Sequence, residues 1–271
     1  MIVVTGATGN IGRPLVEALT AAGEKVVTVS RGDAAFGAGV VHRRADLTAT
    51  ETLKPAFEGG EKLFLLTLDP ELDVAPILDA AKDAGITSVV LISSQRVGTR
   101  PTEALLALEK AAQTSGLEWT VLRPGGFASN AMLWSEPVRK ERTVIAPFGD
   151  VALPVIDPRD IAHVAAAALT EDGHAGRTYT LTGPALISPR QQAEAIAAAI
   201  GEPVRFVEQS RADAHEQLLQ FWPAKVVEDS LDIIGSPNAA ELEISADVER
   251  VLGRPAATFA DWARRNAEAF R

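Results

Sequence analysis

The chain has 271 residues and a net charge of −10. This acidity argues against a nucleic-acid partner, because such proteins normally carry a basic surface that neutralises phosphates. The chain has no cysteine, which excludes disulfides and thiolate chemistry, and its four histidines stand far apart in the sequence, so we expect no metal site.

The longest nearly apolar run, 161–169, contains a histidine and is too short to cross a bilayer, which takes about 20 residues. The first residues lead directly into strand-like sequence and lack the basic segment of a signal peptide. We therefore expect a cytoplasmic protein, monomeric or homodimeric, whose partner is a small molecule and neither nucleic acid nor membrane.

Short β-branched runs alternate with stretches of helical apolar spacing along residues 1–123. The expected strands are 2–5, 25–30, 40–43, 62–67, 88–93 and 118–123, and the expected helices are 11–22, 50–57, 71–84 and 101–115. Glycines at 23, 59–60, 85 and 116 follow these helices, where a helix commonly ends. The alternation predicts an α/β fold of the Rossmann type, a doubly wound parallel sheet with helices on both faces.

The pattern loosens after residue 123. Two further strands are expected near 153–157 and 177–182, flanking a helix over 158–170, and we expect both to return to the core formed by 1–123. From residue 188 the sequence is mainly helical, with a short strand at 203–207 and a last helix at 258–270. Residues 124–271 are therefore expected to form, for the most part, a smaller and mainly helical C-terminal lobe on the substrate side.

The segment TGATGNIG places Gly6, Gly9 and Gly12 between the first strand and the first helix. Gly6 suits the tight turn off the strand, Gly9 lets backbone N–H groups approach an anion, and Gly12 allows close packing of helix on strand. The helix N-terminus adds N–H donors and a partial positive charge. These features predict binding of a dinucleotide through its pyrophosphate.

The second strand ends in Ser30-Arg31, without the acid that holds a ribose 2′-hydroxyl in NAD sites. Arg31 can pair with a 2′-phosphate, which favours NADP(H) over NAD(H). Two alternatives stay open: Arg31 is a solvated surface residue, or nearby Asp33 takes its charge or faces the ribose.

Several longer segments extend this pattern over nearly the whole chain: TGATGNIG (5–12), RADL (44–47), SGLEWTVLRPGGFASN (115–130), LPVIDPRDIA (153–162), GRTYTLTGP (176–184) and GRPAATFADWARRNAEAF (253–270). Together they resemble the NmrA-like branch of the atypical short-chain dehydrogenase/reductases. Within that branch, the set is similar to the type 2 NAD(P)H:quinone oxidoreductases.

The resemblance implies a cofactor site along the carboxyl ends of the strands. It implies that Gly6, Ala7, Thr8, Gly9, Asn10, Ile11 and Gly12 surround the pyrophosphate, Arg31 the adenosine phosphate, Asp46 and Leu47 the adenine, Thr67 and Leu68 the ribose, and Ser93, Ser94, Gln95, Pro124 and Phe127 the nicotinamide.

The chain departs from many short-chain dehydrogenases, which carry a Tyr-x-x-x-Lys acid–base pair on the helix after the fifth strand. Its one tyrosine, Tyr179, lies on an expected strand and is followed four residues later by Gly183. The expected helix carries Glu109 instead, which either braces the loop after the sixth strand or is a solvated helix residue.

Four residues are candidates for the reaction itself. Ser94 and Gln95 are candidate catalytic residues that hydrogen-bond or polarise a substrate oxygen, and Asn130 and Trp134 are candidate substrate contacts. Each also has a structural alternative: a serine that satisfies nearby backbone, a solvated loop residue, an Asx turn and a core aromatic. Asp157 and Asp160 fit the start of a helix better than a catalytic carboxylate pair.

The sequence thus predicts an NADPH-dependent oxidoreductase that transfers hydride to a quinone, an enone or an aromatic ketone, secondary-metabolite intermediates included, without a Tyr-Lys acid. The main alternative is a non-catalytic protein that senses NADP(H). The missing acid–base pair favours this alternative. Sugar-nucleotide epimerisation shares the fold but normally needs the missing tyrosine.

Overall fold

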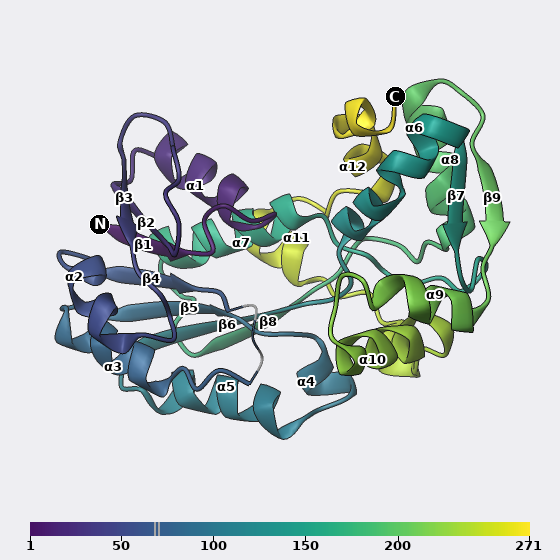
Figure 1. Cartoon of the computed structure of the whole chain (residues 1–271). Helices are drawn as coiled ribbons and strands as arrows, with labels where there is room; N and C mark the ends of the chain where they lie inside the picture. The colour runs from purple at the N-terminus through teal and green to yellow at the C-terminus, as the bar shows by residue number, and fades with distance from the viewer. Residues whose placement is uncertain (68, 70) are drawn as a thin grey trace. The chain divides into compact units, whose positions relative to one another are not determined.

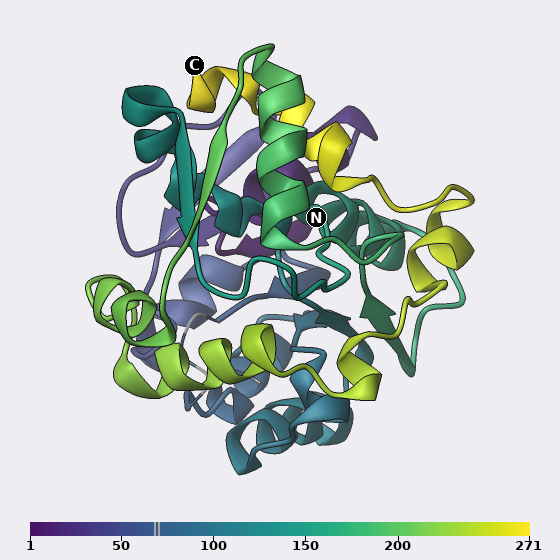
Figure 2. The same cartoon turned by 90° about the vertical axis from the view of Figure 1, so that its right-hand side faces the viewer.

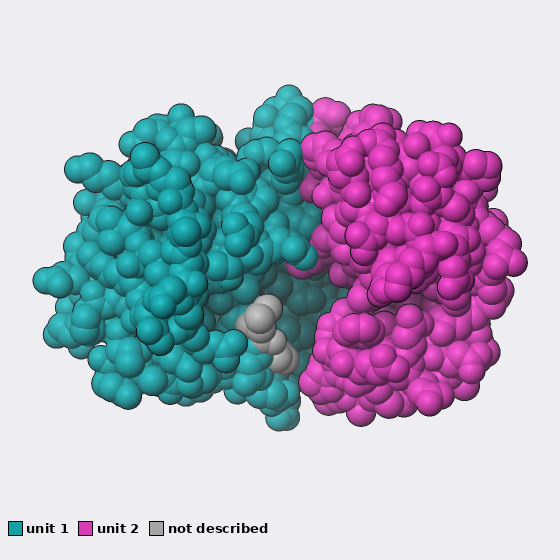
Figure 3. Space-filling model, turned by 45° about the horizontal axis from the view of Figure 1, so that its top comes forward, with its two compact units in different colours: residues 1–124, 158–181, 247–254 teal, residues 125–157, 182–246, 255–271 magenta. Residues whose placement is uncertain are grey.

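Residues 1–67, 69 and 71–271 are described by the computed structural model. They form two units that interleave along the chain (Figure 3). Unit 1 consists of Met1–Pro124, Pro158–Leu181 and Asp247–Arg254, and unit 2 consists of Gly125–Asp157, Thr182–Ala246 and Pro255–Arg271. Each unit is therefore assembled from three separate stretches of sequence.

Unit 1 is built on a parallel seven-stranded sheet with the order β3-β2-β1-β4-β5-β6-β8 (Figure 1). The strands are β1 (Ile2–Thr5), β2 (Val26–Ser30), β3 (Val40–Arg44), β4 (Lys62–Leu65), β5 (Ser88–Ile92), β6 (Glu118–Pro124) and β8 (Arg177–Leu181). The chain moves outward in one direction from β1 to β3 and in the other from β4 to β8. Such a reversal opens a crevice at the carboxyl ends of the strands, where doubly wound sheets bind ligands.

Helices cover both faces of this sheet, which confirms the predicted Rossmann-type class (Figure 1). One face carries α1 (Gly12–Ala21) and α7 (Pro158–Thr170), with α11 (Asp247–Leu252) on α7; the other carries α2 (Leu53–Phe57), α3 (Ala75–Asp83) and α5 (Glu103–Thr114). Alternate strand residues such as Val3, Leu63 and Leu91 bury their side chains against this second set. The short elements η1 (Thr50–Thr52) and α4 (Arg96–Thr99) precede α2 and α5.

The prediction that 153–157 forms a strand of the core sheet is wrong. This segment lies in unit 2, where it makes only two isolated bridges, Phe127 with Ile156 and Leu153 with Ile187. Pro154 has no backbone N–H, so the segment cannot continue a regular ladder. The strand expected at 177–182 does lie beside β6, as β8.

The helix expected at 71–84 begins later, at Ala75. The carboxylate of Asp73 accepts a hydrogen bond from the Ala75 N–H at 3.0 Å, so the side chain satisfies a backbone donor at the helix start. The residues before it therefore turn instead of continuing the helix.

An ion pair between an exposed arginine and a buried carboxylate joins α7 to the end of the α11 segment within unit 1. Arg254 donates to the buried carboxylate of Asp160 at 2.8 Å, and the same Nη2 lies 3.1 Å from Nδ1 of His163. Burial of the imidazole and the charge of Arg254 lower the pKa of His163, while Asp160 opposes this shift. As the pH falls, the His163 imidazole in the folded protein therefore stays neutral at pH values at which an exposed imidazole already takes up a proton.

This lowered pKa predicts an acid-sensitive contribution to stability. Above the ordinary histidine pKa of about 6.5 the contribution is complete, and below it the unfolded chain takes up the proton first, so the free energy of unfolding falls. Urea unfolding followed from about pH 7.5 down to about pH 5 should show a steeper decline for the wild type than for His163→Gln. Equal slopes in the two proteins would contradict this assignment.

Unit 2 packs helices against a two-stranded parallel sheet of β7 (Thr143–Ala146) and β9 (Arg205–Glu208). Its helical elements are η2 (Ala128–Trp134), α6 (Ser135–Glu141), α8 (Pro189–Ile200), α9 (Arg211–Leu218), α10 (Ala224–Gly235), η3 (Ala239–Glu241), α12 (Phe259–Arg265) and η4 (Ala267–Phe270). Figure 2 shows α8 alongside β9. The main core of the unit includes the rings of Phe259, Trp262 and Phe270. The ring centroid of Trp262 lies 5.2 Å from that of Phe259 and 6.1 Å from that of Phe270.

A second, smaller core in unit 2 holds α9 and α10 together around Val227 and Leu231. Phe148 packs on this cluster with φ of +54°, in the left-handed region that bulky residues rarely adopt. Its ring lies against Gly235, where an added Cβ would stand 2.6 Å from the ring. A residue larger than glycine at position 235 would therefore displace the Phe148 ring.

Candidate functional site

The loop between β1 and α1 needs two of its three glycines for its own structure. Gly6 has φ of +63°, and a Cβ there would lie 3.0 Å from Leu66 Cδ2. A Cβ on Gly12 would lie 2.2 Å from the carbonyl oxygen of Gly6, which is shorter than any real contact. Gly6 therefore makes the turn, and Gly12 lets α1 pack directly on the loop.

Gly9 is different, because the protein itself leaves room at this position. Of the described atoms, only the Gly6 carbonyl oxygen comes near an added Cβ, at 3.4 Å, and Thr8, Gly9 and Asn10 are exposed. Since the fold does not require a glycine here, the open space fits a ligand that approaches the backbone.

The start of α1 suits a negatively charged ligand. Ile11 precedes the helix and has no side-chain acceptor to cap it, and the first turn contains Arg13 instead of an acid. The Arg13 Nε donates to the Thr8 carbonyl at 3.1 Å, which ties the cation to the loop. Ala7 and Ile11 are buried, so any contact they make with a phosphate comes from their backbone. The loop and helix start therefore fit the pyrophosphate of a dinucleotide.

Arg31 follows the last residue of β2 and is exposed. Its carbonyl accepts from Arg44 Nε at 3.3 Å, and the same Nε is 3.9 Å from the carboxylate of Asp33. The carboxylate of Asp33 thus lies beside the guanidinium of Arg44, which is the last residue of β3. Two arginines stand at the carboxyl ends of β2 and β3, where the adenosine end of a dinucleotide binds in this fold.

The two residues expected beside adenine follow β3. Asp46 accepts from the backbone N–H and the hydroxyl of Thr48, at 3.0 and 2.8 Å, and these bonds, with a smaller effect of Arg31, lower the pKa of the carboxyl. Leu47 is half-buried against the core of unit 1. The Asp46 side chain thus closes its own turn, and the Leu47 side chain packs on the core.

Two residues were expected along the ribose after β4. Thr67 Oγ1 donates to the carbonyl of Asp69 and accepts from its N–H, both at 3.1 Å. Leu68 lies outside the described residues.

The residues expected around the nicotinamide stand where β5 and β6 end side by side. The N–H of Ser93 donates to the Leu122 carbonyl at 2.8 Å, and the N–H of Gln95 donates to the Pro124 carbonyl at 3.0 Å. Ser94 Oγ accepts from the N–H of Arg96 at 3.2 Å, which is the backbone-satisfying role open to this serine. The hydrogen-bonded ladder thus runs past the last residue of β5 and fixes this edge.

Glu109 connects these strand ends from beneath. It is buried on α5, accepts from Ser93 Oγ at 2.6 Å, and receives a bidentate pair from Arg123 Nε and Nη2 at 2.8 and 2.6 Å. These hydrogen bonds raise the pKa of the Arg123 guanidinium, against the effect of burial. Glu109 is therefore not the solvated helix residue of the second alternative, and its printed partners are Arg123 of β6 and Ser93 after β5, not the loop after the sixth strand.

A signal for this role was present in the sequence. The buried positions of α5 are Leu105, Leu108, Glu109 and Ala112, the i, i+3, i+4, i+7 stripe of a core-facing helix. An acidic residue on that stripe must find a partner, because an unpaired buried charge is strongly unfavourable.

Tyr179 occupies a structural position. It lies on β8, is buried, and its hydroxyl is 2.9 Å from Nδ1 of His174. Burial raises the pKa of its phenol. A phenol with a raised pKa on an edge strand is not an acid–base group of the Tyr-x-x-x-Lys kind.

The remaining expected site residues belong to unit 2. Phe127 is bridged to Ile156, with the Ala128 N–H donating to the Ile156 carbonyl at 2.8 Å. Asn130 is exposed on η2, and its N–H donates to the Phe127 carbonyl at 3.1 Å. Trp134 is half-buried against the main core of unit 2. Phe127 and Asn130 thus belong to one turn, whereas Trp134 serves the core at least in part.

The two carboxylates at the start of α7 are both paired with arginines. Asp157 is buried and pairs with Arg265 inside unit 2, and Asp160 pairs with Arg254 inside unit 1. The sequence predicted helix-start roles for these two residues, and their arginine partners were not predicted. Among the residues that the structure describes, no group of three or more histidine or acidic side chains could hold a metal ion.

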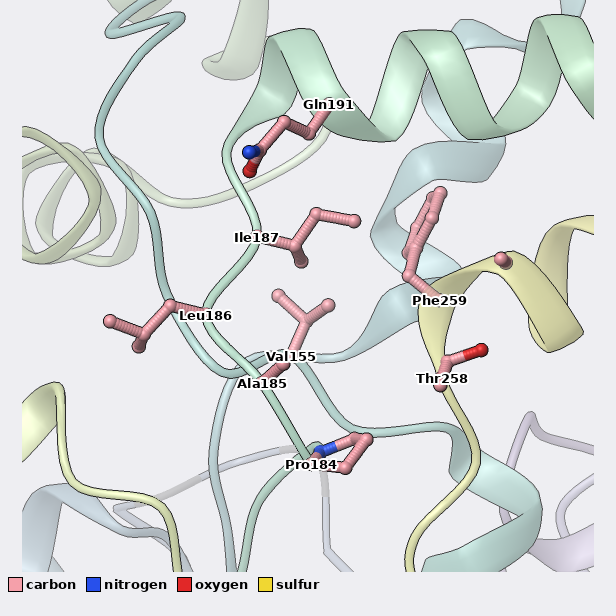
Figure 4. Close-up of a pocket in the computed structure, with 9 residues that line it drawn as sticks. Val155, Pro184, Ala185, Leu186, Ile187, Gln191, Thr258 and Phe259 are labelled. Carbon is pink, nitrogen blue, oxygen red and sulfur yellow. The ribbon is translucent and has the colours of Figure 1, made fainter.

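Unit 2 contains an apolar pocket of about 290 Å³ between the starts of α8 and α12 (Figure 4). Val155, Leu186, Ile187 and Phe259 supply apolar wall, and Gln191 and Thr258 stand at its edge. The Gln191 side-chain oxygen Oε1 accepts from the Ser188 N–H at 2.9 Å, and the Thr258 hydroxyl donates to Asp261 at 2.5 Å. The polar groups at the edge are thus engaged in capping their helices.

Comparisons with known proteins show the family to which this chain belongs. The NAD(P)H-binding family matches residues 6–172. A (4-alkanoyl-5-oxo-2,5-dihydrofuran-3-yl)methyl phosphate reductase of Streptomyces griseus is 35% identical over 100% of this chain and 99% of its own. An NAD(P)H azoreductase of Xenophilus azovorans is 32% identical over 100% and 99%.

A solved structure extends the likeness to the whole fold. The NADPH-dependent quinone oxidoreductase QOR2 of Escherichia coli, complexed with NADPH, has a TM-score of 0.80 and 26% identity, covering 98% of this chain and 99% of that one. No helix within residues 1–67, 69 and 71–271 is long and apolar enough to span a membrane. The chain therefore belongs to the NAD(P)H-binding family, is an NAD(P)H-dependent oxidoreductase, and resembles the NmrA-like type 2 quinone oxidoreductases as its motifs predicted.

Proposed function

We propose that this protein uses NADPH to reduce a conjugated electron acceptor: a quinone, an enone or an aromatic ketone. The printed names of its relatives support this class, since they describe reductases of an alkanoyl-oxo-dihydrofuran, azo compounds and quinones. NADPH supplies a hydride, and one proton from water completes the two-electron reduction and leaves NADP⁺.

The absence of a tyrosine acid among the described residues of α5 and its neighbours supports this proposal. Glu109 is paired with Arg123, and the Ser93 proton is directed at Glu109. The one tyrosine, Tyr179, lies on β8 and contacts His174. A conjugated acceptor suits such a site, because its reduced anion is delocalised and can take a proton from water. The protein then contributes mainly proximity and orientation.

The proposal gives each unit a role. Unit 1 holds the cofactor through the loop 6–12, Arg31, Asp46, Leu47, Thr67, Leu68, Ser93 and Pro124. Of the residues in unit 2, Phe127 is proposed as a further cofactor contact, and Asn130 and Trp134 as substrate contacts. Ser94 and Gln95, after β5, orient the substrate oxygen.

Turnover tests the proposal directly. NADPH oxidation is followed with a panel of a benzoquinone, a naphthoquinone, an alkanoyl-dihydrofuranone, an azo dye and an aromatic ketone. We expect turnover of at least one member, and we expect Tyr179→Phe to keep the rate, because this phenol takes no part. Tight NADPH binding without turnover of any member would favour the sensing role instead.

The preference for NADPH over NADH should depend on Arg31. A hydrogen bond to a charged group contributes about 1.5–3 kcal/mol, so Arg31→Ala should weaken NADPH binding about tenfold to a hundredfold and leave NADH binding nearly unchanged. Fluorescence titrations with both nucleotides measure this. Lys25→Ala, exposed before the opposite end of β2, is the matched control. Equal losses for NADPH and NADH would show that Arg31 does not read the 2′-phosphate.

A further inference from the structure

The Ser93–Glu109–Arg123 network fixes the direction of a hydrogen bond. Glu109 is 3% exposed, and its two carboxylate oxygens together accept three short hydrogen bonds, one from Ser93 and two from Arg123. An ionised carboxylate can only accept, so the Ser93 hydroxyl must be the donor in the 2.6 Å contact. That distance is typical of a strong hydrogen bond to a charged oxygen.

Arg123 keeps this arrangement in place. Its guanidinium balances the charge of the buried carboxylate and occupies both oxygens through a bidentate pair. Rotating the Ser93 hydroxyl elsewhere would leave Glu109 Oε1 without one of its two donors in the interior. The serine proton is therefore committed, and Ser93 Oγ has only lone pairs left to offer.

The backbone holds Ser93 as firmly as the side chain does. Its N–H donates to the Leu122 carbonyl at 2.8 Å, which places it at the joined carboxyl ends of β5 and β6. Its residue exposure is 9%, so Ser93 is nearly buried at this edge of the sheet. A group bound there meets an oxygen that accepts hydrogen bonds and cannot donate one.

We propose that Glu109 is a positioning residue that makes Ser93 Oγ an acceptor for the amide N–H of the nicotinamide carboxamide. This inference rests on the proposed function, which places the nicotinamide at the ends of β5 and β6. The network then selects a carboxamide over a ketone at the same ring position, because a ketone has no N–H to give. It also means that Ser93 is not the proton source for the reduced substrate.

Binding of two reduced cofactors tests the inference without turnover. The probes are NADPH and its 3-acetylpyridine analogue, in which a methyl ketone replaces the carboxamide. The measured quantity is the dissociation constant of the analogue divided by that of NADPH. The loss of one hydrogen bond to the carboxamide lowers this ratio about threefold to tenfold. We expect this lower ratio in Ser93→Ala, which removes the acceptor. We also expect it in the double variant Glu109→Met/Arg123→Met, which frees the hydroxyl to donate to a ketone.

The controls separate this effect from loss of structure. The exposed pair Glu136 and Lys140, 2.5 Å apart on α6, is replaced in Glu136→Gln/Lys140→Gln and should keep the wild-type ratio. Ser88→Ala, at the other end of β5, is the control for Ser93→Ala. If the double variant does not fold, Ser93→Ala decides, since it removes only one oxygen.

The outcomes distinguish this inference from the proposed function. A Ser93→Ala protein that binds NADPH and keeps the wild-type ratio overturns the role of Ser93 and Glu109, while the substrate panel still supports the reductase. A wild type that binds neither probe overturns both.

Discussion

Gly9→Ala should weaken NADPH binding about tenfold or more while leaving the free energy of unfolding within about 0.5 kcal/mol of the wild type. Gly12→Ala should damage both, with a loss of stability of about 1–3 kcal/mol or more. The reason is the space around each glycine. A Cβ on Gly12 meets the Gly6 carbonyl oxygen at 2.2 Å, whereas a Cβ on Gly9 meets that oxygen at 3.4 Å. Urea unfolding and fluorescence titration with NADPH measure the two quantities separately.

A neutral glycine provides the control for this comparison. Gly37 is exposed, with no heavy atom of the described residues within 4 Å of an added Cβ, so Gly37→Ala should change neither stability nor binding. If Gly9→Ala bound NADPH as tightly as the wild type, the backbone of this loop would not hold the pyrophosphate.

Arg123→Met should lower the free energy of unfolding by about 3–5 kcal/mol, because it leaves the carboxylate of Glu109 charged and unpaired in the interior. The double variant Glu109→Met/Arg123→Met should recover to within about 1 kcal/mol of the wild type, since two apolar side chains of similar volume replace the ion pair. A double-mutant cycle in urea, with both single variants, measures the coupling.

The exposed pair of Glu136 and Lys140 sets the scale for that cycle. It is also close, at 2.5 Å, but both side chains are more than 60% exposed, so its removal should cost less than about 1 kcal/mol. A double variant of Glu109 and Arg123 as unstable as Arg123→Met alone would mean that shape, and not charge balance, governs this part of the core.

The sequence predicted the sheet of unit 1 because its signals are local. Each strand is a short apolar run and each helix an amphipathic stretch ended by glycine. The hydrophobic periodicity and the helix-ending glycines therefore indicate the same elements. The strand β7 was not predicted, since Thr143–Ala146 is four residues long and pairs with β9, about sixty positions away. The segment 153–157 has strand-like composition, but its proline prevents a ladder.

The same distinction holds for the site. Gly6, Gly9, Gly12 and Arg31 could be found because the order strand, glycines, helix, strand end gives each a position. The role of Glu109 could not be fixed from neighbours on its helix, because its partners lie on β5 and β6 and meet it only after the sheet has formed. Pairwise rules along a helix describe solvated faces and do not reach across a core.

The interleaving of the units bears on synthesis. When a nascent chain has emerged as far as Pro124, six of the seven strands exist but β6 remains an open edge until Arg177–Leu181 follow. Asp247, whose carboxylate accepts from the Thr180 N–H at 2.8 Å, arrives later still. Unit 1 thus cannot complete itself during translation until residues 247–254 have left the ribosome, and an unpaired edge in that interval is a natural place for chaperones to bind.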